Sequence, residues 1–419
     1  MAARERLFRS FPATRHRDFR ALWGGSACSS VSLWTLLLGN AWIVYHLSNS
    51  SFWVGVSTFA SMSPYLLAPF GGVIADRLER RYLVRATRVG AFLTTSSLFL
   101  LAFTGVIEVW MVVGIALLQG LVRAVEIPSD QALLANVVPI EDLGNAVALT
   151  SMTQQGSRAA GPLLAGPLLA TIGVEGAYGV AAIFALLAFT SMSRVRTSSR
   201  GGVVSLKRVF AELGEGLAYV RATGPVLAVF LIVVAHCSLT MSFDAMLPGF
   251  AETELHSPSS GFTLMTLGVG LGALTGTFVL SMLPIFRRGR LFLLTGIASG
   301  LAPVLMGLSM ALGPAVASTL LMGASQAMFM ALSAILLQEV VPDAVRGRVM
   351  SLYLMGAGGI MAIANLGFGT LADRWGAPVL FWAPGLSFVL IIAASGLLGP
   401  HLPRLYRTGR IVAAPAYGA

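Results

Sequence analysis

Charged residues are scarce in this chain. They make up 11% of its 419 residues, apolar residues make up 56%, and the mean hydropathy is +0.80. This composition excludes an ordinary soluble domain, in which about a quarter of the residues are charged. The apolar runs also lack the alternation that the strands of a membrane β-barrel need. The composition therefore indicates an integral membrane protein built of α-helices.

Cysteine and the usual catalytic motifs are equally rare. Cys28 and Cys237 both fall in apolar runs, which argues against a structural disulfide and against a metal site. The chain also has no His/Glu zinc spacing, no Gly-x-Ser-x-Gly elbow and no phosphate-binding loop. We therefore expect no enzyme activity, no metal and no bound cofactor.

What the chain does have is a series of long apolar runs. A helix needs about 20 apolar residues to cross about 30 Å of hydrocarbon. Twelve runs of this kind predict an all-α fold with twelve transmembrane helices. They cover residues 20–47, 51–75, 82–105, 108–136, 143–169, 174–193, 224–248, 259–283, 290–311, 313–338, 347–370 and 376–399.

The basic residues are distributed unevenly between the two sides of the membrane. A net charge of +10 would by itself fit nucleic-acid binding. However, Arg123 and Arg158 fall inside spans, Arg374 faces outward, and all the other basic residues, Arg88 included, fall on the side of the N-terminus. This positive-inside pattern predicts two cytoplasmic termini and no nucleic-acid partner. The predominance of arginine over lysine indicates a bacterial source, and hence a bacterial inner membrane.

An internal repeat divides the spans into two sets. Residues 137–139 and 340–342 both read Val-Val-Pro. At the same shift Gly144 aligns with Gly347, Gly156 with Gly359, Gly166 with Gly369, and Gly173 with Gly376. A repeat of about half the chain indicates two pseudo-symmetric six-helix halves.

The repeat sets the domain boundaries. We expect a cytoplasmic segment at 1–19, the first half at 20–193, a linker at 194–223, the second half at 224–399 and a cytoplasmic tail at 400–419. Apolar residues from Leu206 to Val220 recur at spacings of three and four, which predicts an amphipathic helix on the membrane surface. A solvated connection is the alternative.

Ala-Asp-Arg occurs at 75–77 and again at 372–374, but the repeat does not align the two copies. It pairs Asp373 with Ala170 at the outer end of the fifth span. We therefore place Asp76 in a cytoplasmic loop and Asp373 in an external turn.

The loop after the second span carries a family signature. It reads Gly72-x-x-x-Asp76-Arg77-x-x-Arg80-Arg81 and, in position, spacing and topology, resembles the signature loop of the major facilitator superfamily. Residues 139–144, 158–166 and 342–349 are similar to the bacterial exporter branch that includes the enterobactin exporter and macrolide efflux proteins. The resemblance covers about residues 15–400. It implies alternating access by rocking of two six-helix halves, usually driven by proton entry.

The resemblance also implies a gate. Asp76 would face the start of the eleventh span, where free N–H groups favour an anion and where Arg346 and Arg348 lie. This contact would stabilise the outward-open state. The gating residues would be Gly72, Asp76, Arg77, Arg80, Arg81, Arg346 and Arg348. The chain departs from the family at Glu79, where glycine is common, and it lacks an arginine at the end of the fourth span. The loop arginines could alternatively serve as topology anchors.

Ionisable residues inside spans are costly and therefore informative. Arg123, Glu126 and Asp130 are spaced by three and four on the fourth span, and the antiparallel fifth span brings Arg158 within about a turn. A carboxylate that alternately meets water and a guanidinium can take up and release a proton. We expect these residues to form a buried cluster, either a proton site or a fixed ion-pair lock.

The seventh span adds Asp244 and His236. Asp244 aligns with Asn40 at a shift one residue longer than that of the repeat, and it is either a third proton-coupling acid or an outer-gate residue. His236 could titrate near neutrality, although a lone helical histidine is more often satisfied by a neighbour. The candidate substrate-cavity residues are Trp34, Asn40, Tyr65 and His236.

A cavity rich in aromatic and apolar groups fits an amphipathic organic compound. We therefore predict a monomeric, proton-coupled exporter of a drug, siderophore or secondary metabolite, with the lipid bilayer, the substrate and protons as partners. Lipid or lysolipid translocation is the alternative, and a nontransporting receptor or scaffold is a further one.

Overall fold

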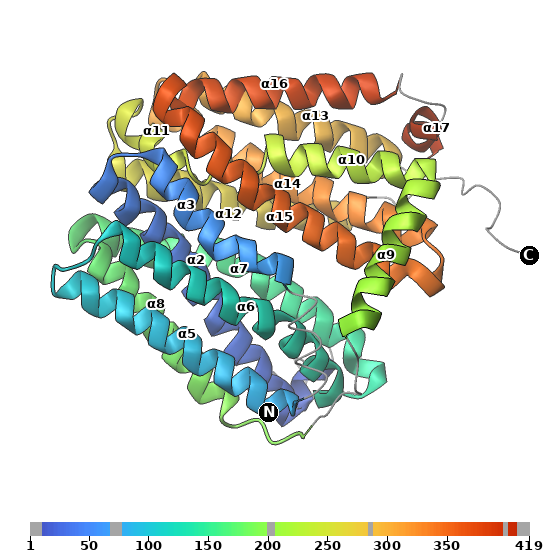
Figure 1. Ribbon diagram of the computed structural model, residues 1–419, viewed down its shortest axis with the longest axis horizontal. Helices are drawn as coiled ribbons and strands as arrows, with labels where there is room; N and C mark the ends of the chain where they lie inside the picture. The colour runs from blue at the N-terminus through green and yellow to red at the C-terminus, as the bar shows by residue number, and fades with distance from the viewer. Residues whose placement is uncertain (1–10, 68–77, 199–205, 284–287, 397–400, 409–419) are drawn as a thin grey trace, which may run out of the picture. The chain divides into compact units, whose positions relative to one another are not determined.

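The structure is a computed structural model that describes residues 11–67, 78–198, 206–283, 288–396 and 401–408. In these residues the secondary structure consists of α-helices and short 3-10 helices, as predicted (Figure 1). The gating candidates Gly72, Asp76 and Arg77 lie outside the described residues.

Seventeen helical elements, including two 3-10 helices, follow one another along the described chain. The first are η1 Pro12–Arg15, α2 Arg17–Ser48, α3 Ser51–Met62, η2 Ser63–Leu67, α5 Arg80–Phe103, α6 Val109–Val137, α7 Ile140–Thr171 and α8 Val174–Met192. The rest are α9 Leu206–Ala222, α10 Gly224–Leu239, α11 Leu247–Thr253, α12 Pro258–Met282, α13 Arg288–Gly307, α14 Leu312–Val340, α15 Asp343–Trp375, α16 Ala377–Ser395 and α17 His401–Thr408.

Within the described residues, fewer helices than the predicted twelve are individually long and apolar enough to be counted as membrane spans. Within the described residues nine helices are long and apolar enough to span, and residues 210–222 joined to α10 would make a tenth, bent by 104°. The predicted fifth span corresponds to α7, which has the length, but its stretch Ser151–Arg158 is polar. The second and seventh spans correspond to α3, with 12 residues, and α10, with 16.

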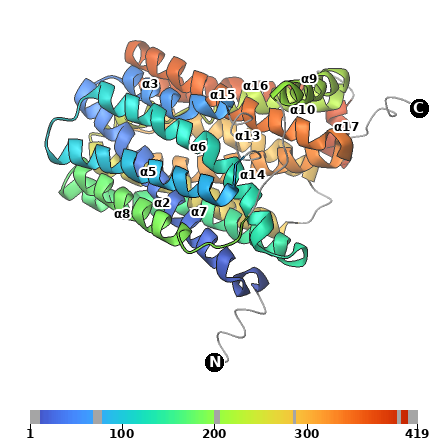
Figure 2. The ribbon, with the colours of Figure 1, turned by 60° about the horizontal axis from the view of Figure 1, so that its bottom comes forward.

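The chain forms two compact units. The first comprises residues 1–48 and 60–206, and the second comprises residues 49–59 and 207–419, so that the boundary falls inside α3. In the first unit α2 packs against α6, α7 and α8, and α5 packs against α6 and α8 (Figure 2). In the second unit α14 packs against α10, α12, α13 and α15.

Matching helix ends occur at the repeated motifs. α6 ends at Val137 and α14 at Val340, and each is followed by a proline that precedes the next long helix. Gly173 and Gly376, which the repeat aligns, have φ values of +113° and +80° after α7 and α15. Glycine adopts this region without steric cost, which explains why both repeats carry it there.

Candidate functional site

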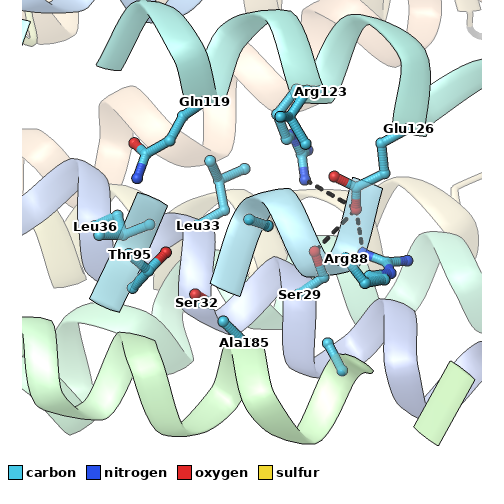
Figure 3. Close-up of a pocket in the computed structure, with 13 residues that line it drawn as sticks. Ser29, Ser32, Leu33, Leu36, Arg88, Thr95, Gln119, Arg123, Glu126 and Ala185 are labelled. Atoms are coloured by element: carbon cyan, nitrogen blue, oxygen red, sulfur yellow. Dashed lines mark hydrogen bonds and ion pairs between the residues drawn. The ribbon is translucent and has the colours of Figure 1, made fainter. Parts of the chain in front are cut away.

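Two helices of the first unit, α5 and α6, bring charged side chains together in its interior, and α2 adds a serine hydroxyl. Arg88 of α5 donates from Nη1 to Oε1 of Glu126 and, at 2.5 Å, from Nη2 to Oδ2 of Asp130. Arg123 Nη1 is 3.8 Å from Glu126 Oε1, and Ser29 of α2 donates to that oxygen at 2.9 Å (Figure 3). Arg88 is 1% exposed and Glu126 is 2% exposed. The site therefore holds a buried cation, Arg88, and a half-buried one, Arg123, balanced by two anions.

The spacing along α6 explains how this site forms. Arg123, Glu126 and Asp130 are three and four residues apart on a helix that continues through Pro128, so they share a face. On α2, Ser26 donates to Asp130 Oδ2 at 3.1 Å. The sequence predicted the three charged residues of α6 together, and the structure places them together.

The basic partner of both acids is the residue that sequence reasoning missed. We assigned Arg88 to the cytoplasmic surface, yet it lies eight residues into α5, which begins at Arg80. Arg88 therefore lies about 12 Å along the helix from its first residue. That distance from the helix start was the signal in the sequence that Arg88 lies in the interior and not at the surface. Arg158, which we expected beside the acids, lies with its guanidinium carbon 4.9 Å from the centroid of the Trp34 ring.

Two opposing energies act on the cluster: attraction between the opposite charges, and the cost of removing each ion from water. Two unit charges about 4 Å apart attract by about 4 kcal/mol at an effective dielectric constant of about 20, while burial of each ion costs several kcal/mol. Removing one partner of such a pair typically costs about 3–5 kcal/mol, because the other charge stays buried and uncompensated. Protonation of an acid changes the charge balance in the same way as its removal, so the cluster is sensitive to proton binding.

The other cavity candidates of the first unit are also in polar contacts. Asn40 is buried and accepts a hydrogen bond from the Tyr178 hydroxyl at 2.8 Å. Tyr65 of η2 lies beside Arg123, where its hydroxyl is an electrostatic partner of the guanidinium. Trp34 packs where α7 approaches α2 at Gly161, because a Cβ on Gly161 would lie 2.7 Å from Trp34 Cβ.

Asp244 lies in a break rather than in a continuous span. The predicted helix 224–248 stops after Leu239 and resumes at Leu247. Side chains from neighbouring helices satisfy the backbone of the break: Gln326 donates to Thr240 O at 2.7 Å, and Asn365 Oδ1 accepts from Ala245 N at 3.2 Å. Transporter sites often lie at breaks of this kind, which keeps Asp244 a candidate.

His236 occupies a packed position in the second unit. Its side chain is fully buried, with ring centroids 4.3 Å from Phe329 and 5.2 Å from Phe388. Its Nε2 forms a 2.7 Å hydrogen bond with Ser299 Oγ. We expected a cavity-lining residue, whereas these surroundings are those of a core side chain.

Three of the described gating candidates, Arg81, Arg346 and Arg348, have partners within their own units. Arg81 donates to the carbonyl of Arg196 at 2.9 Å and pairs with Glu79, which ties the start of α5 to the segment after α8. Arg80 is the first residue of α5.

Arg346 and Arg348 lie near the start of α15. Arg346 pairs with Asp343 at 2.5 Å, and Arg348 pairs with Glu215 at 2.5 Å. Glu215 belongs to the linker helix α9, which crosses the end of α15 (Figure 1). Arg348 therefore holds the linker helix on the second unit.

Asp373 has a contact that its predicted place in an external turn did not suggest. It lies in the last turn of α15, and the turn begins only at Gly376. Its carboxylate accepts hydrogen bonds from Ser51 N at 2.7 Å, Phe52 N at 3.1 Å and Ser50 Oγ at 2.5 Å. It thus caps the N-terminus of α3 and satisfies N–H groups that have no partner within that helix.

Comparison with known proteins identifies the family. The model of the transmembrane secretion effector family matches residues 9–406. Macrolide efflux protein A of Streptococcus pyogenes is 23% identical, covering 83% of this chain and 86% of its own length. The enterobactin exporter EntS of Shigella boydii is 27% identical, covering 81% of each chain.

Solved structures show the same fold. A crystal structure of a D-xylose–proton symporter has a TM-score of 0.70 at 16% identity, covering 92% of this chain and 97% of the symporter. A peptide transporter of the POT family, in complex with sulfate, has a TM-score of 0.73 at 13% identity, covering 93% and 96%. The resemblance drawn from the signature loop is confirmed. The chain therefore belongs to the transmembrane secretion effector family of the major facilitator superfamily, and it is a membrane transporter rather than an enzyme.

Proposed function

We propose that this protein is a secondary active exporter that moves an amphipathic organic compound by alternating access and couples that movement to proton entry. The names of its relatives, one for macrolide efflux and one for enterobactin export, support the export direction and the class of cargo. The proposal includes twelve spans in two six-helix halves, cytoplasmic termini in a bacterial plasma membrane, and a monomer as the functional state.

The observation that carries proton coupling is the buried cluster of Arg88, Arg123, Glu126 and Asp130. Its four charges sum to zero when both acids are ionised, and one added proton leaves a net positive charge in a largely buried site. An uncompensated buried charge is costly, so proton binding favours an arrangement of the helices that relieves it. A conformational equilibrium shifts by as much as the difference in proton affinity between its two states.

Reconstituted vesicles test this function directly. Purified protein is placed in liposomes with an imposed pH difference, and uptake or release of a macrolide, enterobactin and a fluorescent lysolipid is followed. The proposal predicts that one of the organic compounds moves against its gradient only while the pH difference is present. Lysolipid movement that continues without any gradient would instead identify a lipid translocator.

A further inference from the structure

Two cavities in the first unit meet at the charge cluster. One holds roughly 450 Å³ and the other roughly 560 Å³ of space not filled by protein atoms, their open mouths included. Both are lined by Ser29, Arg88, Arg123 and Glu126, so these four residues form the partition between them. Figure 3 shows the first cavity with Glu126 at the partition, contacted by Arg88, Arg123 and Ser29.

The cavities follow one another along α6. Gln119 lines only the first and Asp130 only the second, while Glu126 borders both. Eleven residues separate Gln119 from Asp130 on one helix, which corresponds to about 16 Å along its axis. The two spaces therefore lie in series, with the Arg88–Glu126 pair between them.

Buried polar atoms without protein partners mark this route. In the described part of the chain they include Thr95 Oγ1 and Gln119 Nε2 on the first cavity, and Arg123 Nε and Glu126 Oε2 at the partition. Asp130 Oδ1, on the second cavity, is a further one. A buried polar group without a hydrogen bond costs about 1–3 kcal/mol. Water relieves that cost where a cavity has room and polar partners for it, and these atoms supply such partners at the partition and on the walls of both cavities.

In each acid, one carboxylate oxygen is held by hydrogen bonds and the other is available to bind a proton. Arg88 and Ser29 donate to Oε1 of Glu126, and Arg88 and Ser26 donate to Oδ2 of Asp130. The other oxygen of each acid, Glu126 Oε2 and Asp130 Oδ1, has no hydrogen-bond partner among the described residues. The engaged oxygens hold the acids in place, and the free oxygens can accept a proton from water without breaking the ion pairs first.

We propose that these cavities form a hydrated proton path inside the first unit, with Asp130 as the entry acid and Glu126 as the inner acid. A proton from water in the second cavity adds to Asp130 Oδ1. Transfer through water to Glu126 Oε2 then moves one proton across the partition and returns Asp130 to a carboxylate, while Arg88 stays charged. Thr95 and Gln119 hold the water that carries the proton onward in the first cavity.

The surrounding groups fit this path. Among the described residues, the charged groups that face the two acids are Arg88 from α5 and Arg123 from α6. Tyr65 of η2 stands beside Arg123, and the Cys28 thiol of α2 lies near Arg88. α7 contributes neutral Thr150 and Gln154 to the second cavity, and α8 contributes Ala185 and Ala188 to the first. A single transferred proton therefore determines the net charge of this site.

The path rests on the proposed proton coupling, and its test leaves both acids intact. Thr95→Val and Gln119→Leu keep the side-chain size but remove the groups that hold water. Thr94→Val is the matched control, because its hydroxyl already bonds the carbonyl of Gly90 at 2.9 Å. Size-exclusion profiles check that each variant is folded.

A pH-sensitive dye inside the vesicles reports proton entry, and substrate exchange without a gradient reports the rest of the cycle. The path predicts that the Thr95→Val/Gln119→Leu variant loses about tenfold or more in substrate-dependent proton entry, while exchange stays within about twofold of wild type. It is overturned if wild type moves protons and the variant moves them equally well, or if the Thr94→Val control shows the same loss. If wild type itself moves no protons, the proposed coupling fails instead.

Discussion

Replacement of Arg88 by methionine is the sharpest test of how the cluster is held together. The change leaves Glu126 with Arg123 at 3.8 Å, and it leaves Asp130 with the Ser26 hydroxyl at 3.1 Å. Asp130, a half-buried anion, is then uncompensated, and the fully buried Arg88–Glu126 pair is lost, which predicts a loss of about 3–5 kcal/mol. For a unit of about 200 residues, 1 kcal/mol corresponds to about 2–4 °C. The expected fall in melting temperature is therefore about 6–20 °C.

The double variant Arg88→Met/Glu126→Gln restores the charge balance with one cation and one anion. It should recover at least half of the lost stability, so that the two changes are strongly non-additive. Melting curves of detergent-purified protein measure both values, and the exposed Arg194→Met on the same unit is the control. The reasoning is refuted if Arg88→Met melts like the control, or if the double variant is less stable than Arg88→Met alone.

Two further predictions concern helix contacts. Gly161→Ala should destabilise the protein by about 1–3 kcal/mol, because its Cβ would lie 2.7 Å from Trp34 Cβ; Gly156→Ala, with nothing within 4 Å of its Cβ, should not. Equal melting temperatures for Gly161→Ala and Gly156→Ala would contradict the close approach of Gly161 to Trp34. Asp373→Ala should cost about 1 kcal/mol of cap energy and speed amide exchange at Ser51 and Phe52. The control is Arg374→Ala, at the exposed neighbouring residue, which should leave amide exchange at Ser51 and Phe52 at the wild-type rate. If Asp373→Ala also exchanges at the wild-type rate, Asp373 is not the cap.

The charged face of α6 was predictable because it depends only on spacing within one helix. Arg123, Glu126 and Asp130 share a face in any α-helix. Their partner depends instead on how α5 is rotated against α6, and no local pattern encodes that rotation. The positive-inside rule placed Arg88 by its nearness to other arginines, although its depth in α5 is decisive.

Tertiary contacts also explain why the surroundings of Asp244 and Asp373 differ from those predicted from the sequence. The break at Asp244 persists because Gln326 and Asn365 satisfy buried backbone groups in it, and these residues are far from it in sequence. Asp373 is a cap because α15 continues to Trp375 and brings its carboxylate to the first residues of α3. Motif and repeat therefore predicted the family and many helix positions, whereas the partners of individual polar residues required the folded chain.

The central claim is that the acids of the buried cluster carry the coupling proton. The most direct measurement compares gradient-driven transport with gradient-free substrate exchange for Glu126→Gln and Asp130→Asn in the same vesicles. The exposed Glu252→Gln serves as the matched control. We predict that both cluster variants lose gradient-driven transport and keep exchange, while the control keeps both. Gradient-driven transport at the wild-type rate in both cluster variants would contradict the account.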